Sequence, residues 1–102
     1  MKGTEMEFEW DNEKNLANIK NHNIDFETAA RVFGDPFRLE KYDKYHSDNE
    51  DRFITIGEIN GTTFVIMVVF TDRGNVTRII SARKATSLER KKYYENKKKY
   101  RP

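Results

Sequence analysis

The sequence predicts an α+β fold in which a short strand and two helices precede an antiparallel β-meander and a terminal helix. Three observations support this prediction. The most apolar run, residues 63–71, is followed after a turn signal by a β-branched run at 76–80. An Asn-Gly pair at 60–61, the strongest short hairpin signal, separates the apolar run from an earlier β-rich run. Apolar residues at helical spacing occupy 26–33.

The N-terminal segment is expected to form a strand and a first helix. Residues 6–10 alternate polar and apolar side chains, which is the pattern of a half-buried strand. Asp11 can cap a helix over residues 12–22, and Asn23 suits the left-handed position that ends it. We expect three apolar residues on the inner side of this helix: Leu16, Ala17 and Ile19.

A second helix is predicted after Asp25, which offers another N-cap. Its apolar residues recur at the i, i+3, i+4 and i+7 spacing of one helical face, so they form a buried stripe. Gly34 and the Asp35-Pro36 pair end the helix, because proline disfavours a helical backbone in the residue before it. The stripe consists of Phe26, Ala29, Ala30 and Phe33.

The rest of the chain is predicted to contain four strands and one helix. A polar, acidic loop at 43–51 separates the first two strands, and a tight turn at 72–75 separates the last two. Thr86 and Glu89 have the spacing of a capping box, which opens a weakly amphipathic helix over 87–98. The four strands are expected at 37–42, 52–59, 63–71 and 76–86.

The composition excludes several classes of protein. The chain has no cysteine, which excludes a disulfide framework and thiol chemistry. The N-terminus has no apolar signal region and no run is long enough to span a membrane, so we expect a cytoplasmic protein. A length of 102 residues suits one domain over residues 1–102, with a frayed basic tail at 96–102.

The charge is distributed unevenly along the chain. Residues 1–60 hold 8 Lys/Arg against 14 Asp/Glu, whereas residues 61–102 hold 11 against 3, although the whole chain carries only +2. A basic half of this kind predicts an anionic partner on one face, and nucleic acid is the commonest one. On charge alone, a solvated basic helix explains the pattern equally well.

No metal site or cofactor is expected. Four possible oxygen or nitrogen ligands lie close together in the loop, but they have neither the spacing of a calcium loop nor a second ligand cluster. A glycine-rich phosphate loop, a nucleophile elbow and a dinucleotide fingerprint are also missing from the sequence. The four loop residues are His46, Asp48, Glu50 and Asp51.

Cationic and acid–base chemistry are the remaining possibilities for the function of the chain. Cleavage of RNA without a metal needs a base for the 2′-hydroxyl, cations for the charge on the pentavalent phosphorus, and an acid for the leaving oxygen. His46, Glu50 or a tyrosine could move the protons. Four cations on or beside the predicted strands could stabilise the charge: Arg52, Arg78, Arg83 and Lys84.

These groups converge only if the loop at 43–51 folds back over the end of the sheet. A structural role is the alternative for each cation. Arg52 and Arg78 could pair with a neighbour on an adjacent strand, such as Glu58. The lysines within 90–99 could form a solvated helical face.

Several motifs follow one another along the chain. They are Phe-Glu-Trp-Asp at 8–11, Lys-Asn-His-Asn-Ile-Asp-Phe at 20–26, Ala-Ala-Arg-Val-Phe at 29–33, Glu-Asp-Arg-Phe at 50–53, and Arg-Ile-Ile-Ser-Ala-Arg-Lys-Ala-Thr at 78–86. In this order they resemble the BrnT family of toxins, and the resemblance extends from about residue 6 to about residue 95. Asn23 stands where the family commonly has glycine, and asparagine tolerates that backbone position.

The resemblance implies the toxin of a type II toxin–antitoxin pair. The implied fold is RelE-like, and the implied activity is that of a ribonuclease that cleaves RNA and arrests translation. The implied partner is a BrnA-like antitoxin, which contacts operator DNA through a ribbon-helix-helix domain and assembles as two antitoxins with two toxins. The alternative is a module without catalytic activity that binds antitoxin or nucleic acid and acts as a co-repressor.

Carried over by motif, the catalytic candidates are the residues that the chemistry already favours. We expect alanine at Arg83 to abolish growth inhibition without loss of the fold. A second group of cations is expected to hold RNA: Arg73, Arg90 and Lys91. The catalytic candidates are Arg52, Arg78, Arg83 and Lys84, followed by His46 and Glu50.

Overall fold

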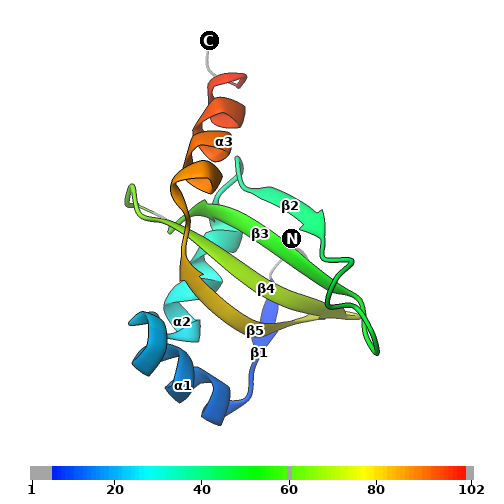
Figure 1. Cartoon of the computed structure of the whole chain (residues 1–102). Helices are drawn as coiled ribbons and strands as arrows, with labels where there is room; N and C mark the ends of the chain where they lie inside the picture. Colours follow the sequence, from blue (N-terminus) through cyan, green and yellow to red (C-terminus); the bar gives the residue numbers. More distant parts are fainter. Residues whose placement is uncertain (1–5, 60, 101–102) are drawn as a thin grey trace, which may run out of the picture.

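The computed structural model describes residues 6–59 and 61–100 and contains one five-stranded sheet. The strands lie in the order β1-β5-β4-β3-β2, and β2 to β5 form an antiparallel meander in chain order (Figure 1). The strands are β1 (Glu7–Glu9), β2 (Leu39–Tyr42), β3 (Arg52–Glu58), β4 (Val65–Arg73) and β5 (Val76–Lys84). The predicted α+β class and meander are therefore confirmed.

The N-terminal strand adds a feature that the sequence did not predict. β1 pairs in parallel with β5, and Glu9 lies opposite Arg78 in that register. The sheet thus has β1 at one edge and β2 at the other. Because registered residues on neighbouring strands point to the same face, this pairing brings an acidic N-terminal residue beside a cation of β5.

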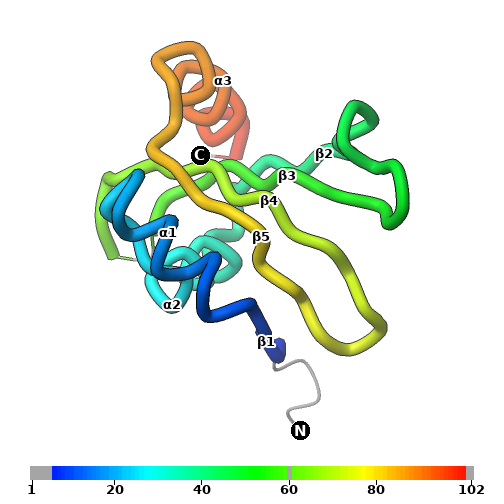
Figure 2. The backbone as a smooth tube through the Cα atoms, turned by 60° about the horizontal axis from the view of Figure 1, so that its bottom comes forward, coloured from blue at the N-terminus to red at the C-terminus, as the bar shows by residue number. Residues whose placement is uncertain are grey.

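Within the described residues, three helices and a 3₁₀ segment accompany the sheet. They are α1 (Asn12–His22), α2 (Phe26–Ala29), the 3₁₀ segment Ala30–Gly34, and α3 (Ser87–Lys98). Figure 2 shows α1 and α2 together on one side of the sheet, with α3 beyond the end of β5. The second predicted helix is therefore confirmed in its first turn and tightens to a 3₁₀ form over the rest of its predicted length.

The predicted helix caps are present. The Asp11 carboxylate accepts from the backbone N–H of Glu13 at 2.8 Å and of Lys14 at 3.2 Å, which satisfies two of the free donors at the start of α1. Asn23 ends α1 with a φ of 57°, the left-handed position predicted for it. The Thr86 side chain and Glu89 form a complete capping box at the start of α3.

The predicted inner face of α1 is wrong. All three apolar residues expected to face inward are exposed, with Leu16 at 65% and Ile19 at 38%, and Ala17 is exposed as well. The buried residue is Asn18, whose amide donates to the Ala82 carbonyl at 2.9 Å and accepts from the Ala82 N–H at 3.1 Å. The amide satisfies the backbone of β5 beyond the end of β1, so α1 docks through a polar group and leaves its apolar residues outside.

The sheet has a different apolar cluster on each face. On one face, the buried stripe of α2 and the 3₁₀ segment packs on Ile66, Val68 and Phe70 of β4. On the other face, Tyr93 of α3 packs with Val65 and Ile56. The alternation of Val65 and Ile66 between the two clusters follows from the two-residue period of a strand. The second face is covered by α3 at one end only, and we call it the open face.

The hairpins differ in their turns. The β3–β4 connection is a longer loop than an Asn-Gly turn, because the Ile59 N–H donates to the Phe64 carbonyl and β4 begins at Val65 instead of residue 63. Asn60 lies outside the described residues. The β4–β5 connection is the tight turn that was predicted, with Gly74 at a φ of 67°. That turn fixes which residues of β4 and β5 face each other.

Candidate functional site

A row of polar residues crosses the open face near the β4–β5 turn. Arg52 of β3 lies opposite Thr71 of β4, and Thr71 lies opposite Arg78 of β5. Arg78 in turn lies opposite Glu9 of β1. Because directly opposite residues share a face, these four side chains stand side by side across four strands. We call this part of the sheet, with the adjoining β2–β3 loop, the open end.

Two carboxylates border the cations of the open end. Arg73 donates from Nε and Nη2 to both oxygens of Glu50 at 2.8 and 2.9 Å. Oε2 of Glu9 lies 3.3 Å from Nη1 of Arg78 and 3.5 Å from Nη1 of Arg73. Among the described residues Arg52 has no ion pair within 4.0 Å. The loop at 43–51 therefore folds back to the sheet end, as convergence of the site required, and Figure 1 shows it beside the β4–β5 turn.

The environment of Glu50 suits an ionised side chain. The hydrogen bonds from Arg73 lower the pKa of the Glu50 carboxyl, and the charges of Arg73, Arg78 and Arg52 lower it further. A general base that works near neutral pH needs a pKa raised towards 7, which is the opposite direction. The contacts of Glu50 thus favour an electrostatic role over proton transfer.

His46 is oriented by a buried aspartate. Its Nδ1 lies 3.0 Å from Oδ2 of Asp43, which is 8% exposed, while the imidazole itself is largely exposed. The loop is fixed around this pair, because Ser47 donates to the Asp43 carbonyl at 2.6 Å and accepts from the Arg52 N–H at 2.9 Å. An imidazole held through Nδ1 presents Nε2 outward, which is the arrangement that proton transfer requires.

A cavity joins the loop to the open end. It has a volume of about 360 Å³, and its walls include the two candidate proton-transfer groups and one cation. The structure therefore brings together His46, Glu50 and Arg52, with Arg78 and Arg73 beside them. The cavity lining is His46, Asp48, Asn49, Glu50 and Arg52.

Of the two remaining candidates, Arg83 lies at the other end of the open face, beside α3. Arg83 is five residues from Arg78 on β5, which corresponds to about 15 Å of strand. Its guanidinium donates to both oxygens of Glu89, at 2.9 and 3.0 Å, and once to the Lys84 carbonyl. Glu89 also closes the capping box of α3. We call this region the covered end.

Lys84 does not join Arg83. Arg83 lies opposite Met67, whereas Lys84 lies opposite Ile66, which belongs to the cluster on the face that α2 and the 3₁₀ segment cover. Successive residues of a strand point to opposite faces, so the two adjacent cations are separated by the sheet. Lys84 is exposed at the end of its strand.

The covered end is held by a network of polar contacts. Tyr93 is fully buried and donates its hydroxyl hydrogen to the Asp35 carboxylate, and Asp35 also accepts from the Glu58 N–H at 2.8 Å. Glu58 accepts from Tyr94 at 2.7 Å and from Lys97 at 3.0 Å. Glu58 is thus occupied by α3, and neither Arg52 nor Arg78 pairs with it. Burial, and then the bond to Asp35, raise the pKa of Tyr93, which keeps its proton as a donor.

The expected RNA-holding cations do not form one patch. Arg73 belongs to the open end. Arg90 lies on α3 with its guanidinium 5.5 Å from the ring centre of Tyr94, and Lys91 is exposed on the same helix. Sequence reasoning missed Glu9, Asp43 and Thr71. The tight turn could have revealed Thr71, because counting back from Gly74 places it opposite Arg78.

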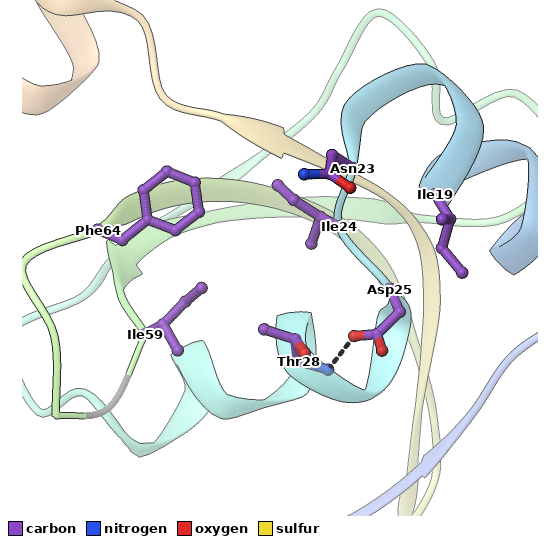
Figure 3. A pocket seen from close by; sticks show the side chains of 7 residues that line it. All are labelled: Ile19, Asn23, Ile24, Asp25, Thr28, Ile59 and Phe64. Atoms are coloured by element: carbon purple, nitrogen blue, oxygen red, sulfur yellow. Dashed lines mark hydrogen bonds between the residues drawn. The ribbon is translucent and has the colours of Figure 1, made fainter.

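An apolar groove lies on the helical side of the molecule, away from these cations. Figure 3 shows Ile19 and Ile24 on one side of it and Ile59 and Phe64 on the other, with the Asp25–Thr28 cap at its floor. Its volume is about 290 Å³. Arginine and lysine are missing from its described lining, so this groove lacks the charge that a phosphate chain requires.

The described part of the chain contains neither a metal-binding cluster nor a helix that could span a membrane. Within residues 6–59 and 61–100, His, Asp and Glu side chains do not gather in groups of three that could hold a metal ion. None of the helices in those ranges is long and apolar enough to cross a membrane.

Comparison with known proteins identifies one family. The chain matches the family described as "Ribonuclease toxin, BrnT, of type II toxin-antitoxin system" over residues 10–89. The match covers 80 of the 102 residues, from Trp10, directly after β1, to Glu89 in the first turn of α3. It therefore includes every residue of the open end except Glu9. No curated protein matches the chain.

Proposed function

The chain belongs to the BrnT family of ribonuclease toxins of type II toxin–antitoxin systems, and we propose that it cleaves RNA at the open end of its sheet without a metal ion. Membership of the family implies RNA as the target and an antitoxin protein as the partner. The observation that carries the proposal is the convergence of Arg52, Arg78, Glu50 and His46 at one end of a rigid sheet. A rigid sheet holds charges in the fixed geometry that transition-state stabilisation needs.

Each group at the open end has a role in this reaction. The 2′-hydroxyl of RNA loses its proton as its oxygen attacks the neighbouring phosphorus, and the bond from phosphorus to the 5′-oxygen breaks as that oxygen takes up a proton. Arg52 and Arg78 stabilise the negative charge that develops on the phosphorus oxygens. His46, oriented by Asp43, transfers protons through Nε2. Glu50 holds Arg73 at the margin and keeps the loop against the sheet.

The proposed partner is a BrnA-like antitoxin, with two copies of each protein in the complex and operator DNA contacted only by the antitoxin. We place neutralisation in the cytoplasm and at the open end. The network around Tyr93 and Glu58 fixes α3 on the sheet. An antitoxin that covers the open end therefore needs less free energy than one that displaces α3 and breaks these hydrogen bonds. Arg90 and Lys91 on α3 form a second cationic contact for RNA, separate from the open end.

The test is cleavage of a long RNA by the purified chain in the presence of a chelator. We expect fragments from the parent, none from an all-2′-deoxy oligonucleotide of the same sequence, and a loss of at least hundredfold for Arg52→Gln. Arg52 is suited to this test because its side chain makes no ion pair with the described residues.

The matched control is Arg31→Gln, which removes an exposed arginine from the helical side of the sheet. It should cleave like the parent. Intact RNA with the parent chain, both alone and with ribosomes added, would instead support the alternative of a module that only binds its antitoxin or nucleic acid. Equal losses in both variants would show that net charge matters and the open end does not.

A further inference from the structure

The hydroxyl of Thr71 is buried without a partner. Thr71 is 1% exposed, and among the described residues its Oγ1 is the buried side-chain oxygen that no hydrogen bond satisfies. Thr55 on the neighbouring strand is equally buried, at 0% exposure, but its hydroxyl donates to the Leu39 carbonyl at 3.0 Å. Buried polar groups are nearly always paired, because an unpaired one loses its bonds to water without replacement.

The neighbours of Thr71 explain which group is missing. Arg52 and Arg78 flank it in the cross-strand row, with Cβ atoms about 5 Å away on either side. A guanidinium carries donors and no acceptor. The nearby carboxylates already pair with arginines, Glu50 with Arg73 and Glu9 with Arg78 and Arg73. The Thr71 oxygen could accept from either guanidinium, but no such bond is present, and the hydroxyl hydrogen has no acceptor in the row.

We infer that Arg52, Thr71 and Arg78 form a binding site for one phosphate group. A phosphate presents oxygens in several directions, so one group can accept from both guanidinium groups and from the hydroxyl between them. Thr71 stands in the middle of the row, where its hydroxyl fixes the position of the phosphate between the two arginines. The identification of the ligand as an RNA phosphate rests on the proposed function, whereas the site itself rests on the row.

The strands give this site a precision that surface arginines lack. The three residues come from the central strands β3, β4 and β5, whose backbones are paired on both sides. A phosphate seated over Thr71 lies beside the cavity that His46 and Glu50 line with Arg52. Thr71 is a positioning residue in this arrangement, because it places the phosphate for groups that act on its neighbouring oxygens.

The test exchanges the two buried threonines for valine, which keeps the β-branched shape and removes only the hydroxyl. The probes are inorganic phosphate and a 2′-O-methyl RNA oligonucleotide, which lacks the attacking hydroxyl and so stays intact. We expect Thr71→Val to weaken binding of the oligonucleotide by about tenfold or more, because a bond to a charged group is lost. Its denaturant midpoint should equal or exceed that of the parent, since an unpaired buried hydroxyl is removed.

Thr55→Val is the matched control and should behave in the opposite way. Its denaturant midpoint should fall, because the Leu39 carbonyl loses its donor, and its affinity for the oligonucleotide should match the parent. Thr71→Ser keeps a hydroxyl and should bind the oligonucleotide within about threefold of the parent. Competition between inorganic phosphate and the oligonucleotide, seen in the parent and weakened in Thr71→Val, would place the phosphate at this row.

The outcomes separate this inference from the ribonuclease proposal. If the parent does not cleave RNA but Thr71→Val still loses affinity, the phosphate site stands and the ribonuclease proposal fails. If the parent cleaves RNA and Thr71→Val binds and cleaves like the parent, the phosphate site at Thr71 is refuted. A fall in denaturant midpoint for Thr71→Val as large as that for Thr55→Val would also refute it, because the hydroxyl would then have a structural partner.

Discussion

Two arginines on one strand show how differently the two ends of the open face are built. Arg78 and Arg83 both lie on β5, and they share the open face because a shift of register opposite Val69 and Phe70 inserts one extra residue between them. Arg78 makes one contact of 3.3 Å with an exposed carboxylate and stands beside an unpaired hydroxyl. Arg83 makes two bonds to Glu89 and one to a backbone carbonyl. The guanidinium of Arg78 therefore has donors without an acceptor among the described residues, whereas Arg83 donates three hydrogen bonds to protein acceptors.

The difference separates a ligand site from a structural contact. At the covered end, Glu89, Asp35 and Glu58 each accept from more than one donor, so the cations and hydroxyls there are satisfied by the protein itself. At the open end, Arg52 has no ion pair with the described residues and the buried Thr71 hydroxyl has no hydrogen-bond partner, so an anion that binds there gains bonds that the protein does not supply. Unsatisfied donors on a rigid scaffold are therefore stronger support for an anion site than the number of cations.

The largest expected effect compares Arg78 with Arg83 directly. Arg78→Gln should lower the rate of RNA cleavage by about hundredfold, because charge stabilisation at the phosphorus is lost, and should leave the free energy of unfolding within about 0.5 kcal/mol of the parent. Arg83→Gln should lower the free energy of unfolding by about 1 kcal/mol and the cleavage rate much less. Cleavage assays and denaturant titrations on both variants measure this.

The reverse pattern would overturn the comparison. If Arg83→Gln abolished cleavage and kept full stability, the catalytic centre would lie beneath α3, in agreement with the expectation drawn from the sequence. If both variants lost activity and neither lost stability, the open face would act as one long RNA-binding surface.

The next effect concerns the anchor of the covered end. Tyr93→Phe removes a donor from the buried Asp35 carboxylate and should lower the free energy of unfolding by about 2 kcal/mol. Tyr94→Phe, one residue further on the same helix, removes a half-buried hydroxyl and should cost less than about 1 kcal/mol. Denaturant titration compares the two. Equal costs would show that burial of Asp35 does not control the docking of α3.

The sequence predicted most elements because their signals are local. The helix caps and the tight turn at 72–75 depend on residues a few positions apart, and they appear as predicted. The inner face of α1 was wrong because Asn18 meets Ala82, a partner 64 residues away whose backbone groups need a donor and an acceptor. An apolar count along the helix cannot detect that requirement.

The candidate site was predicted in composition but not in arrangement. Arg52, Arg78, Glu50 and His46 were all singled out from the sequence, and the structure brings them to one end. Glu9 was missed because its place depends on the parallel pairing of β1, which has no local signal. Arg83 and Lys84 were grouped as neighbours in the sequence, although a strand sends adjacent residues to opposite faces.

A smaller effect follows from the ionisation of Glu89. Glu89→Gln can keep the capping box but loses the ion pair with Arg83, so the free energy of unfolding should fall by about 1 kcal/mol at neutral pH. The bonds from Arg83 lower the pKa of Glu89 below its usual 4.5. The stability that the pair contributes is therefore present above pH 4.5 and is lost as the pH falls through the lower folded value.

Denaturant titrations of the parent and Glu89→Gln from pH 7 to pH 3 measure this dependence. We expect the difference between the two proteins to be constant down to about pH 4.5 and then to shrink. A difference that stays constant to the lowest pH would mean that the carboxylate charge does not contribute to the covered end.

The smallest expected effect tests whether carboxylates compete with a ligand at the open end. Glu9→Gln frees Arg78 from its acceptor, and an exposed pair of this kind contributes at most about 1 kcal/mol. Affinity for the 2′-O-methyl oligonucleotide should therefore rise by about two- to fivefold. Glu13→Gln removes the same charge from the exposed first turn of α1 and is the matched control. A local competition predicts a gain for Glu9→Gln alone, whereas equal gains in both variants would assign the effect to net charge.

The covered end offers the contrast. Glu58→Gln there should lower the free energy of unfolding without raising the affinity for the oligonucleotide, because its donors Tyr94 and Lys97 belong to the anchor of α3.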